Sequence, residues 1–431
     1  MRWAAPLTAL LAAALASPAY AIGAARTPIE HFFVLMQENH SFDNYFGTYP
    51  GAKGIPRGAC MPVGSGRSRT GCVRPFHLGG RAAPEVSDDV LTHRVQFARG
   101  HMDGFIRAAS AGRQATERSV MGYYDGRDLP YYWSLARRYV LFDRFFASAP
   151  GGSFPNHMFW LTGTPGPPSG GVPRGGLDLP TVFDRLEERG ISWRFYVQDY
   201  DPRRRFTRRR GADHSVQSLR VPLLNYPRFV EDRTLLSHIV DLDEYYRDLE
   251  RGTLPQVAYI APAGASEHPP ARLRGGQRLV RALLNALLRS GAWRSSAFLL
   301  SYDDWGGWFD HARPPSPGGT TYGFRVPALL VSPYARRGHV DSTLLETASI
   351  PRFIEENWGL GALTPRDARA GRLSGAFDFS RPPRRPAILA VGRATGQRRQ
   401  ARRMVIYLGY GVALLLGAVL VGRAALRREP A

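Results

Sequence analysis

Gln37-Glu38-Asn39-His40-Ser41-Phe42-Asp43-Asn44-Tyr45-Phe46-Gly47 follows directly on the apolar run Ile29 to Met36. A short apolar run of this kind predicts a buried strand. In an open α/β sheet, ligands bind beyond the carboxyl ends of the strands, so polar residues placed there are candidates for a site. Glu38 and Asn39 are therefore the first site candidates. The alternative is that this pair only caps the helix or turn that follows.

Further apolar runs of strand length alternate with amphipathic stretches. Strands are predicted at Ile191 to Val197, Gln256 to Ala261, Ala297 to Tyr302 and Val326 to Ser332, and helices at Leu179 to Arg189, Gly276 to Ser290 and Ser342 to Trp358. This alternation predicts an α/β fold, a three-layer α/β/α sandwich with a mainly parallel central sheet.

The two ends of the chain carry targeting patterns. Residues 1–21 have an early Arg2, an apolar stretch and a small-x-small triplet at Ala19 to Ala21, which is the pattern of a signal peptide. Residues 404–422 form an uncharged apolar run long enough for a transmembrane helix. We therefore expect a catalytic domain at 22–380, an Arg/Pro-rich linker at 381–403, and a short cytoplasmic tail at 423–431. The expected localisation is exported and anchored to the membrane, with the catalytic domain outside the cytoplasm.

The net charge is +21, and nearly all of the basic residues are arginine, with Lys53 as the lone lysine. Outside the cytoplasm such charge favours anionic lipid headgroups and phosphorylated substrates as partners. A nucleic-acid partner is not expected, because no basic stripe with interleaved aromatic residues is present. The arginine excess also fits a bias in the base composition of the genome. In an exported chain, Cys60 and Cys72 favour a local disulfide.

A second polar cluster, Ser301-Tyr302-Asp303-Asp304-Trp305-Gly306-Gly307-Trp308-Phe309-Asp310-His311, follows the strand predicted before it. Adjacent carboxylates repel each other unless a cation lies near them. Asp303 and Asp304 therefore predict a divalent metal ion of unknown identity, with a solvated acidic turn as the alternative.

A third cluster, Gly151-Gly152-Ser153-Phe154-Pro155-Asn156-His157, has the composition of a loop entering a helix. Ser153 could be an ordinary helix cap, or a nucleophile activated by a metal ion.

Taken together, the three clusters resemble the bacterial phosphoesterase family of phospholipases C and acid phosphatases, part of the alkaline-phosphatase-like superfamily. The resemblance rests on four ordered segments: Glu38 to Gly47, Gly100-His101-Met102-Asp103-Gly104-Phe105, Ser153 to Asn156, and Tyr302-Asp303-Asp304 through Pro314-Pro315. It runs from Ile29 to about Leu360.

The resemblance implies a role for each matched residue. Glu38, Asn39, Asp303 and Asp304 would hold the metal, and Ser153 would be the nucleophile that is transiently phosphorylated. His268, in Glu267-His268-Pro269-Pro270, together with His311 and His93, would be catalytic. The residues expected to bind substrate are Asn39, Asn156, His101 as the rival of His93, and His214.

The resemblance also sets the competing functions. A phospholipase C-type phosphodiesterase is favoured, with an acid-phosphatase-type phosphomonoesterase as the alternative. A catalytically inactive, membrane-tethered binding protein is the lower-weight alternative. Asp304 stands where many family members have glutamate, so the position of the metal could shift. The chain also has no room for the carboxy-terminal β domains of larger phospholipases C, which puts phospholipid specificity in doubt.

Overall fold

The structure, a computed structural model, describes residues 23–63, 71–79, 84–111, 117–316, 319 and 321–389. The predicted signal peptide, the apolar run at 404–422 and the tail at 423–431 lie outside these residues, as does most of the predicted linker. Within the described ranges, no helix is both long enough and apolar enough to cross a bilayer.

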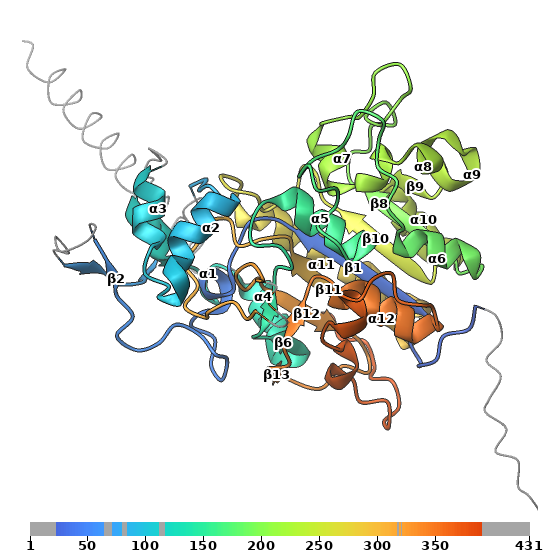
Figure 1. Ribbon diagram of the computed structural model, residues 1–431. Coiled ribbons are helices and arrows are strands. Elements are labelled where there is room, and N and C mark those ends of the chain that lie inside the picture. Colours follow the sequence, from blue (N-terminus) through green and yellow to red (C-terminus); the bar gives the residue numbers. More distant parts are fainter. Residues whose placement is uncertain are drawn as a thin grey trace, which may run out of the picture.

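The fold is organised around a sheet of eight strands (Figure 1). In their spatial order the strands are β13 (His339–Asp341), β6 (Val140–Phe142), β12 (Ala328–Val331), β11 (Ser296–Tyr302), β1 (His31–Gln37), β10 (Val257–Ala261), β8 (Trp193–Val197) and β9 (Ile239–Asp241). β1 is central and pairs in parallel with β10 and with β11. β12 is antiparallel to both of its neighbours, and all other pairings in this sheet are parallel. The prediction of an α/β fold with a mainly parallel sheet is confirmed.

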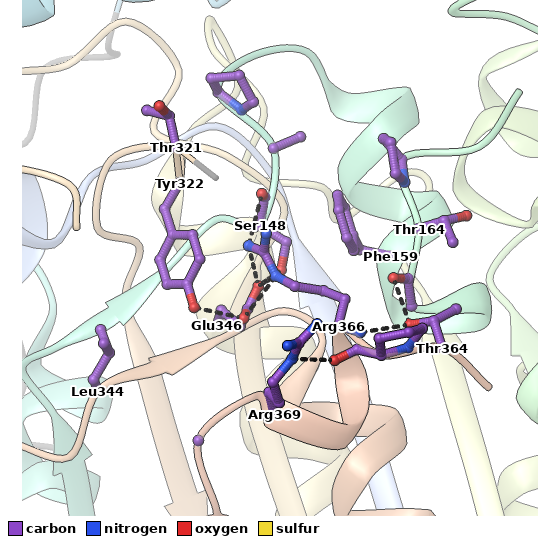
Figure 2. Close-up of a pocket in the computed structure, with 16 residues that line it drawn as sticks. Ser148, Phe159, Thr164, Thr321, Tyr322, Leu344, Glu346, Thr364, Arg366 and Arg369 are labelled. Atoms are coloured by element: carbon purple, nitrogen blue, oxygen red, sulfur yellow. Dashed lines mark hydrogen bonds and ion pairs between the residues drawn. The ribbon is translucent and has the colours of Figure 1, made fainter. Parts of the chain in front are cut away.

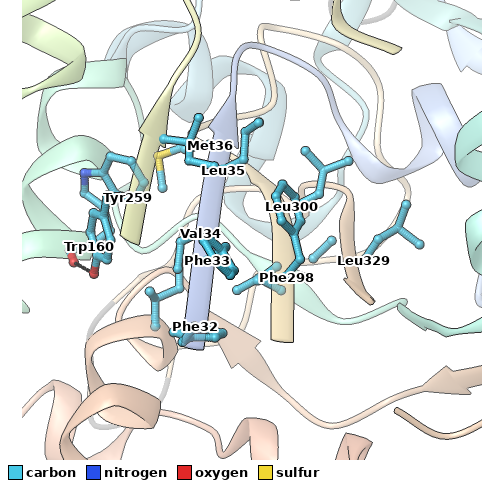
Figure 3. Close-up of a cluster of buried hydrophobic side chains, with 14 of the residues drawn as sticks. Phe32, Phe33, Val34, Leu35, Met36, Trp160, Tyr259, Phe298, Leu300 and Leu329 are labelled. Carbon is cyan, nitrogen blue, oxygen red and sulfur yellow. Dashed lines mark hydrogen bonds between the residues drawn. The ribbon is translucent and has the colours of Figure 1, made fainter. Parts of the chain in front are cut away.

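Side chains on β1 alternate between two buried faces, as the pleat of a strand requires. Phe32 contacts Phe353 of one helix at a ring-centroid distance of 4.6 Å, and Phe33 contacts Tyr245 of another at 5.8 Å. Both phenylalanines are fully buried (Figure 3). A strand covered on both faces is apolar throughout, which explains the continuous run in the sequence.

Two groups of helices form the outer layers. In the first group, α11 (Leu273–Arg289) packs against both α4 (Pro130–Arg138) and α10 (Asp243–Arg251). The second group consists of α5 (Ser153–Thr162), α6 (Val182–Glu188) and α12 (Ser349–Trp358), which pack against one another. Phe353 belongs to α12 and Tyr245 to α10, so the two groups cover opposite faces of the sheet. The three-layer arrangement follows.

The remaining helices and strands are short. They are α1 (Phe42–Phe46), α2 (Val90–Phe97), α3 (Phe105–Ala111), α7 (Val216–Arg220), α8 (Pro227–Glu231) and α9 (Arg233–Leu236), with β2 (Met61–Pro62), β3 (Cys72–Val73), β4 (Phe76–His77), β5 (Gly122–Tyr123), β7 (Phe145–Phe146) and β14 (Leu345–Glu346). Cys60 and Cys72 form the disulfide that the sequence favoured, beside the β2–β3 pair.

Each predicted element has an observed counterpart, but the helix starts differ: α6 begins at Val182 rather than Leu179, α11 at Leu273 rather than Gly276, and α12 differs most. The sequence predicted a helix from Ser342, but α12 begins at Ser349. The preceding residues Leu345 and Glu346 form β14 and pair with β7 instead. This pairing is a tertiary contact, and helical periodicity in one sequence cannot detect it.

Candidate active site

Glu38 lies immediately after β1 and is almost completely buried. Arg220, the last residue of α7, donates to both oxygens of its carboxylate, with Nη2 3.1 Å from Oε2. Burial alone would raise the pKa of Glu38, but the neighbouring His157 and the charge of Arg220 outweigh it and lower the pKa to about 2. Glu38 is therefore ionised at neutral pH.

Asn39 adopts a left-handed backbone conformation, with φ of 63°. Its amide N–H donates to Oδ1 of Asp303 at 3.1 Å, and its side-chain Nδ2 donates to Asp88. Its side-chain Oδ1 is buried and has no hydrogen-bond partner. Strained conformations of this kind gather at functional sites. A Cβ on Gly306 would lie 2.2 Å from the Asn39 carbonyl oxygen, so this close approach of the two segments requires glycine.

Asp303 and Asp304 follow β11, the neighbour of β1, and both are fully buried. Oδ2 of Asp303 has no hydrogen-bond partner. Burial and then the charge of Glu38 raise the pKa of Asp303 to about 6. Burial and the charges of Asp88 and Asp303 raise the pKa of Asp304 well above its usual range. The carboxyl groups crowd one another, and bound protons or a cation in addition to Arg220 would relieve their repulsion.

Ser153 is the first residue of α5, where backbone N–H groups of the first turn have no partner within the helix. Its hydroxyl donates to Oδ2 of Asp304 over 3.4 Å. Gly152 supplies a positive φ of 80° at the turn into the helix, and its N–H donates to the Asp88 carbonyl at 2.9 Å. The serine, the acidic cluster and a helix N-terminus therefore meet at one point.

His157 lies one helical turn after Ser153, and its side chain is 1% exposed. Its Nε2 is 3.7 Å from Oε1 of Glu38 and 3.7 Å from Oδ2 of Asp303. Neither ring nitrogen has a hydrogen-bond partner. Candidate ligand atoms of these three residues all lie within 4.8 Å of one another.

These atoms fit a divalent metal ion. Buried polar groups without partners are rare, and each calls for an explanation. Oδ1 of Asn39, Oδ2 of Asp303 and both His157 nitrogens are all buried without a hydrogen-bond partner. Separations of 3.7 Å are too long for hydrogen bonds, but they leave room for a cation bonded to nitrogen and oxygen at about 2.0–2.2 Å.

The structure distributes the sequence-predicted residues unevenly. Glu38, Asn39, Ser153, Asp303 and Asp304 come together as described above. His268 is half-buried near Asp88. Burial raises the pKa of Asp88, and the charge interaction with His268 partly offsets this increase. Its Nδ1 lies 2.6 Å from the Pro269 carbonyl oxygen.

His311 belongs to a separate charged cluster. Its Nδ1 lies 2.7 Å from Oδ2 of Asp43, whose other oxygen accepts from Arg325 at 3.0 Å. Burial would lower the pKa of His311, but the hydrogen bond and charge of Asp43 raise it above its usual value. Asp43, Asp310 and His311 form a second group of potential metal ligands. Arg325 already balances the charge of the two carboxylates, so this group has less need of a metal ion.

The other predicted residues have different surroundings. His93 is buried in an aromatic cluster, 4.6 Å from the Phe324 ring centroid, and burial lowers its pKa to about 4. The His101 and His214 side chains are exposed. Asn156 accepts from the Ala149 amide at 2.9 Å and donates to the Gly152 carbonyl at 3.1 Å, so its side chain braces the loop before Ser153.

Sequence reasoning missed three residues that the structure places at this site: Asp88, His157 and Arg220. His157 had a usable signal, because a residue four positions after Ser153 lies on the same face of a helix. Arg220 had none, since it lies at the end of a five-residue helix in a long connection.

A cavity of about 800 Å³ lies on the other side of α5 and is lined by Phe159, Ser148, Glu346 and Arg366 among others (Figure 2). Phe159 is two positions from His157 and thus points to the opposite face of the helix. Glu346 is paired with Arg366 at 2.6 Å and accepts from Ser148 and Tyr322. Its charge is satisfied, and we assign this cavity no part in the chemistry.

The fold and the site define an α/β protein with a serine and a carboxylate-rich cation site at the carboxyl edge of a parallel sheet. The model of the Phosphoesterase family matches residues 29–361, and the chain belongs to this family. Membership supports a hydrolase acting on phosphoester bonds.

Similar proteins carry the name phospholipase C. Non-hemolytic phospholipase C of Pseudomonas aeruginosa is 30% identical over an alignment covering 88% of this chain and 61% of that protein. Phospholipase C A of Mycobacterium tuberculosis is 28% identical, covering 89% of this chain and 82% of that protein. The chain thus spans less than two thirds of the length of the Pseudomonas relative.

Among solved structures, a protein of the alkaline phosphatase superfamily from Vibrio parahaemolyticus is 12% identical, with a TM-score of 0.39 over 82% of this chain and 70% of that one. The lipoteichoic acid synthase LtaP of Listeria monocytogenes is 9% identical, with a TM-score of 0.41 over 81% of this chain and 77% of that one. Likenesses of this size carry no argument about function.

Proposed function

We propose that the chain is a metal-dependent phosphoesterase in which Ser153 is the nucleophile, and that it acts as a phospholipase C-type phosphodiesterase. One observation carries the proposal: a serine at a helix N-terminus donates to Asp304, and buried ligand atoms of Glu38, His157 and Asp303 cluster one helical turn away. Such a combination suits attack on an anionic phosphoester, because the cation and the helix N-terminus balance its charge. Names of the similar proteins support a phospholipid substrate.

Glu38, Asp303 and His157 would hold the metal, with Oδ1 of Asn39 as a further oxygen ligand. When bound, the metal supplies positive charge that stabilises the serine alkoxide and the phosphoryl oxygens. Arg220 fixes the Glu38 carboxylate through two hydrogen bonds, and thereby fixes the orientation of one ligand. Asn39 ties the two strand ends together through its N–H bond to Asp303.

The reaction proceeds through two displacements at phosphorus. The hydroxyl proton of Ser153 points to Asp304, which leaves the Oγ lone pairs free to attack. A bond forms between Oγ and phosphorus as the hydroxyl proton passes to the Asp304 carboxylate and the bond to the leaving alcohol breaks, and the alcohol oxygen takes up a proton. His268, half-buried near Asp88, is our choice for the proton donor. Water then attacks phosphorus and gives a proton to His268, the bond to Oγ breaks, and Oγ takes back a proton from Asp304, which regenerates the serine.

We also propose that the protein is exported and held at a membrane by residues 404–422. This proposal rests on the sequence alone, through the signal-peptide pattern at the amino terminus and the apolar run near the carboxyl terminus.

The test is a two-substrate assay on purified protein with divalent metals supplied one at a time. Phosphatidylcholine in mixed micelles should yield diacylglycerol, with no inorganic phosphate released directly. Release of inorganic phosphate from an aryl phosphate without any diacylglycerol would replace the phosphodiesterase proposal with a phosphomonoesterase. Turnover of neither substrate with every metal would contradict both and favour a binding protein.

A further inference from the structure

A strongly basic loop, Asp201 to Arg210, projects between β8 and α7 beside the green helices in Figure 1. Its basic residues are Arg203, Arg204, Arg205, Arg208, Arg209 and Arg210, and all but the half-buried Arg205 are exposed. The side chains of Arg203 and Arg208 are 86% and 85% exposed. Nothing in the proposed chemistry uses this loop.

The loop has a defined conformation. Phe206 is buried, and its N–H donates to the Leu224 carbonyl at 2.8 Å. A short bridge joins Thr207 to Gly211. The phenylalanine anchors the middle of the loop in the protein, so the arginines on either side of it are held at the surface.

Internal ion pairs leave much of this charge unbalanced. Asp201 bonds to Arg203 at 2.9 Å and lies 3.9 Å from Arg204, and Glu231 pairs with Arg208 at 2.7 Å. In the described part of the chain, Arg205 and Arg209 have no acidic partner within 4 Å. Clustered like charges repel one another, and an external anionic surface relieves that repulsion.

The loop is attached to the active-site edge of the sheet. It leaves β8 at the carboxyl end, and β8 is separated from β1 by β10 alone. The Gln217 side chain on α7 accepts from the Asp201 N–H at 2.8 Å and donates to the Asp201 carbonyl at 2.9 Å. The same helix ends at Arg220, which binds Glu38. The loop and the metal-ligand candidates are thus linked through one short helix.

We propose that the loop Asp201 to Arg210 is a docking surface for anionic lipid membranes. It offers many guanidinium groups on one tip, and each arginine at an anionic bilayer surface raises the affinity about fivefold. The aromatic residue of the loop is buried and cannot stack on nucleobases, which disfavours single-stranded nucleic acid. Docking holds the carboxyl edge of the sheet near the lipid headgroups. The binding is independent of turnover, and goes beyond the proposed function.

Trypsin footprinting of the full chain tests the proposal, because every arginine of the loop is a cleavage site. The protein is reconstituted with neutral phosphatidylcholine vesicles or with vesicles that also contain phosphatidylserine, and cleavage sites are read by mass spectrometry. On anionic vesicles in low salt, cleavage within 203–210 should slow by about tenfold or more, and high salt should restore it. Cleavage at Arg289 and Arg294 should not change, because these residues precede β11 and lie at the amino-terminal ends of the parallel strands, away from the loop.

Matched variants separate the loop from the rest of the basic chain. The triple change Arg204→Gln, Arg205→Gln and Arg209→Gln should abolish protection at the remaining loop arginines, while the corresponding lysine triple should retain it. Three glutamines at Arg251, Arg289 and Arg294, all near the amino-terminal ends of the parallel strands, should leave protection intact. Equal protection on neutral vesicles, no protection on anionic ones, or protection by a DNA duplex alone would overturn the proposal.

Discussion

Replacing His157 with glutamine should weaken metal binding without unfolding the protein. His157 Nε2 lies 3.7 Å from an oxygen of Glu38 and 3.7 Å from one of Asp303, and neither ring nitrogen is hydrogen-bonded. If His157 is a ligand, its loss removes one bond to the metal and should reduce the affinity for the metal by about 100-fold. Mutating a residue that only hydrogen-bonds to a metal ligand already reduces affinity by about 10- to 100-fold. Glutamine keeps a similar length and a polar end, which limits the packing defect.

The assay is metal titration by equilibrium dialysis, with turnover of an aryl phosphoester followed at limiting and at saturating metal. Excess metal should restore much of the activity of His157→Gln. A matched control is His93→Gln, which also removes a buried imidazole with an unpartnered Nε2, but one surrounded by aromatic rings rather than carboxylates. The control should bind metal normally. Wild-type metal affinity in His157→Gln would refute the assignment of His157.

Two further predictions concern stability. Arg325→Met leaves Asp43 and Asp310 buried without the guanidinium group that bonds to them at 3.0 and 2.9 Å. The substitution should lower the free energy of unfolding, measured by urea titration, by about 3–5 kcal/mol. The control substitution Arg247→Gln, at an exposed residue, should have no measurable effect, and equal effects of the two would contradict a stabilising role of the Asp43–Arg325–Asp310 ion pairs. Burial and then the neighbouring Asp367 raise the pKa of Glu355 from 4.5 to about 9. Between pH 4.5 and about 9, the folded state therefore retains a proton that the unfolded state releases. The free energy of unfolding should fall as the pH rises through this range, by up to about 1.4 kcal/mol per pH unit. Glu355→Gln should remove this part of the pH dependence in denaturation curves, and an unchanged slope would show that Glu355 titrates normally.

The sequence was most informative where apolar strands end in charged residues. Ile29 to Met36 and Ala297 to Tyr302 are apolar because both faces of the central strands are covered, and the carboxylates that follow them are costly to bury. This contrast marks Glu38, Asp303 and Asp304 as site candidates without any structure. The parallel pairing of β1 with β11 then brings them together.

Side chains that arrive from surrounding helices and loops were beyond the reach of sequence patterns. His157 is followed by Met158, Phe159, Trp160 and Leu161, so its segment has the composition of a core helix. Asp88 and Arg220 reach the site only through tertiary packing. Asn156 looked like a substrate ligand, but it braces the loop before Ser153. Local patterns locate strand ends and helices, but not which distant helix supplies a countercharge.

The central claim is that Ser153 carries the phosphoryl group during turnover. Acid quenching of the enzyme during turnover, followed by peptide mass spectrometry, tests it most directly. We predict one added phosphoryl group, or phosphorylated headgroup, on the peptide containing Ser153, and none in Ser153→Ala, which should be folded but inactive. Turnover by Ser153→Ala, or a modification on another residue, would contradict the account.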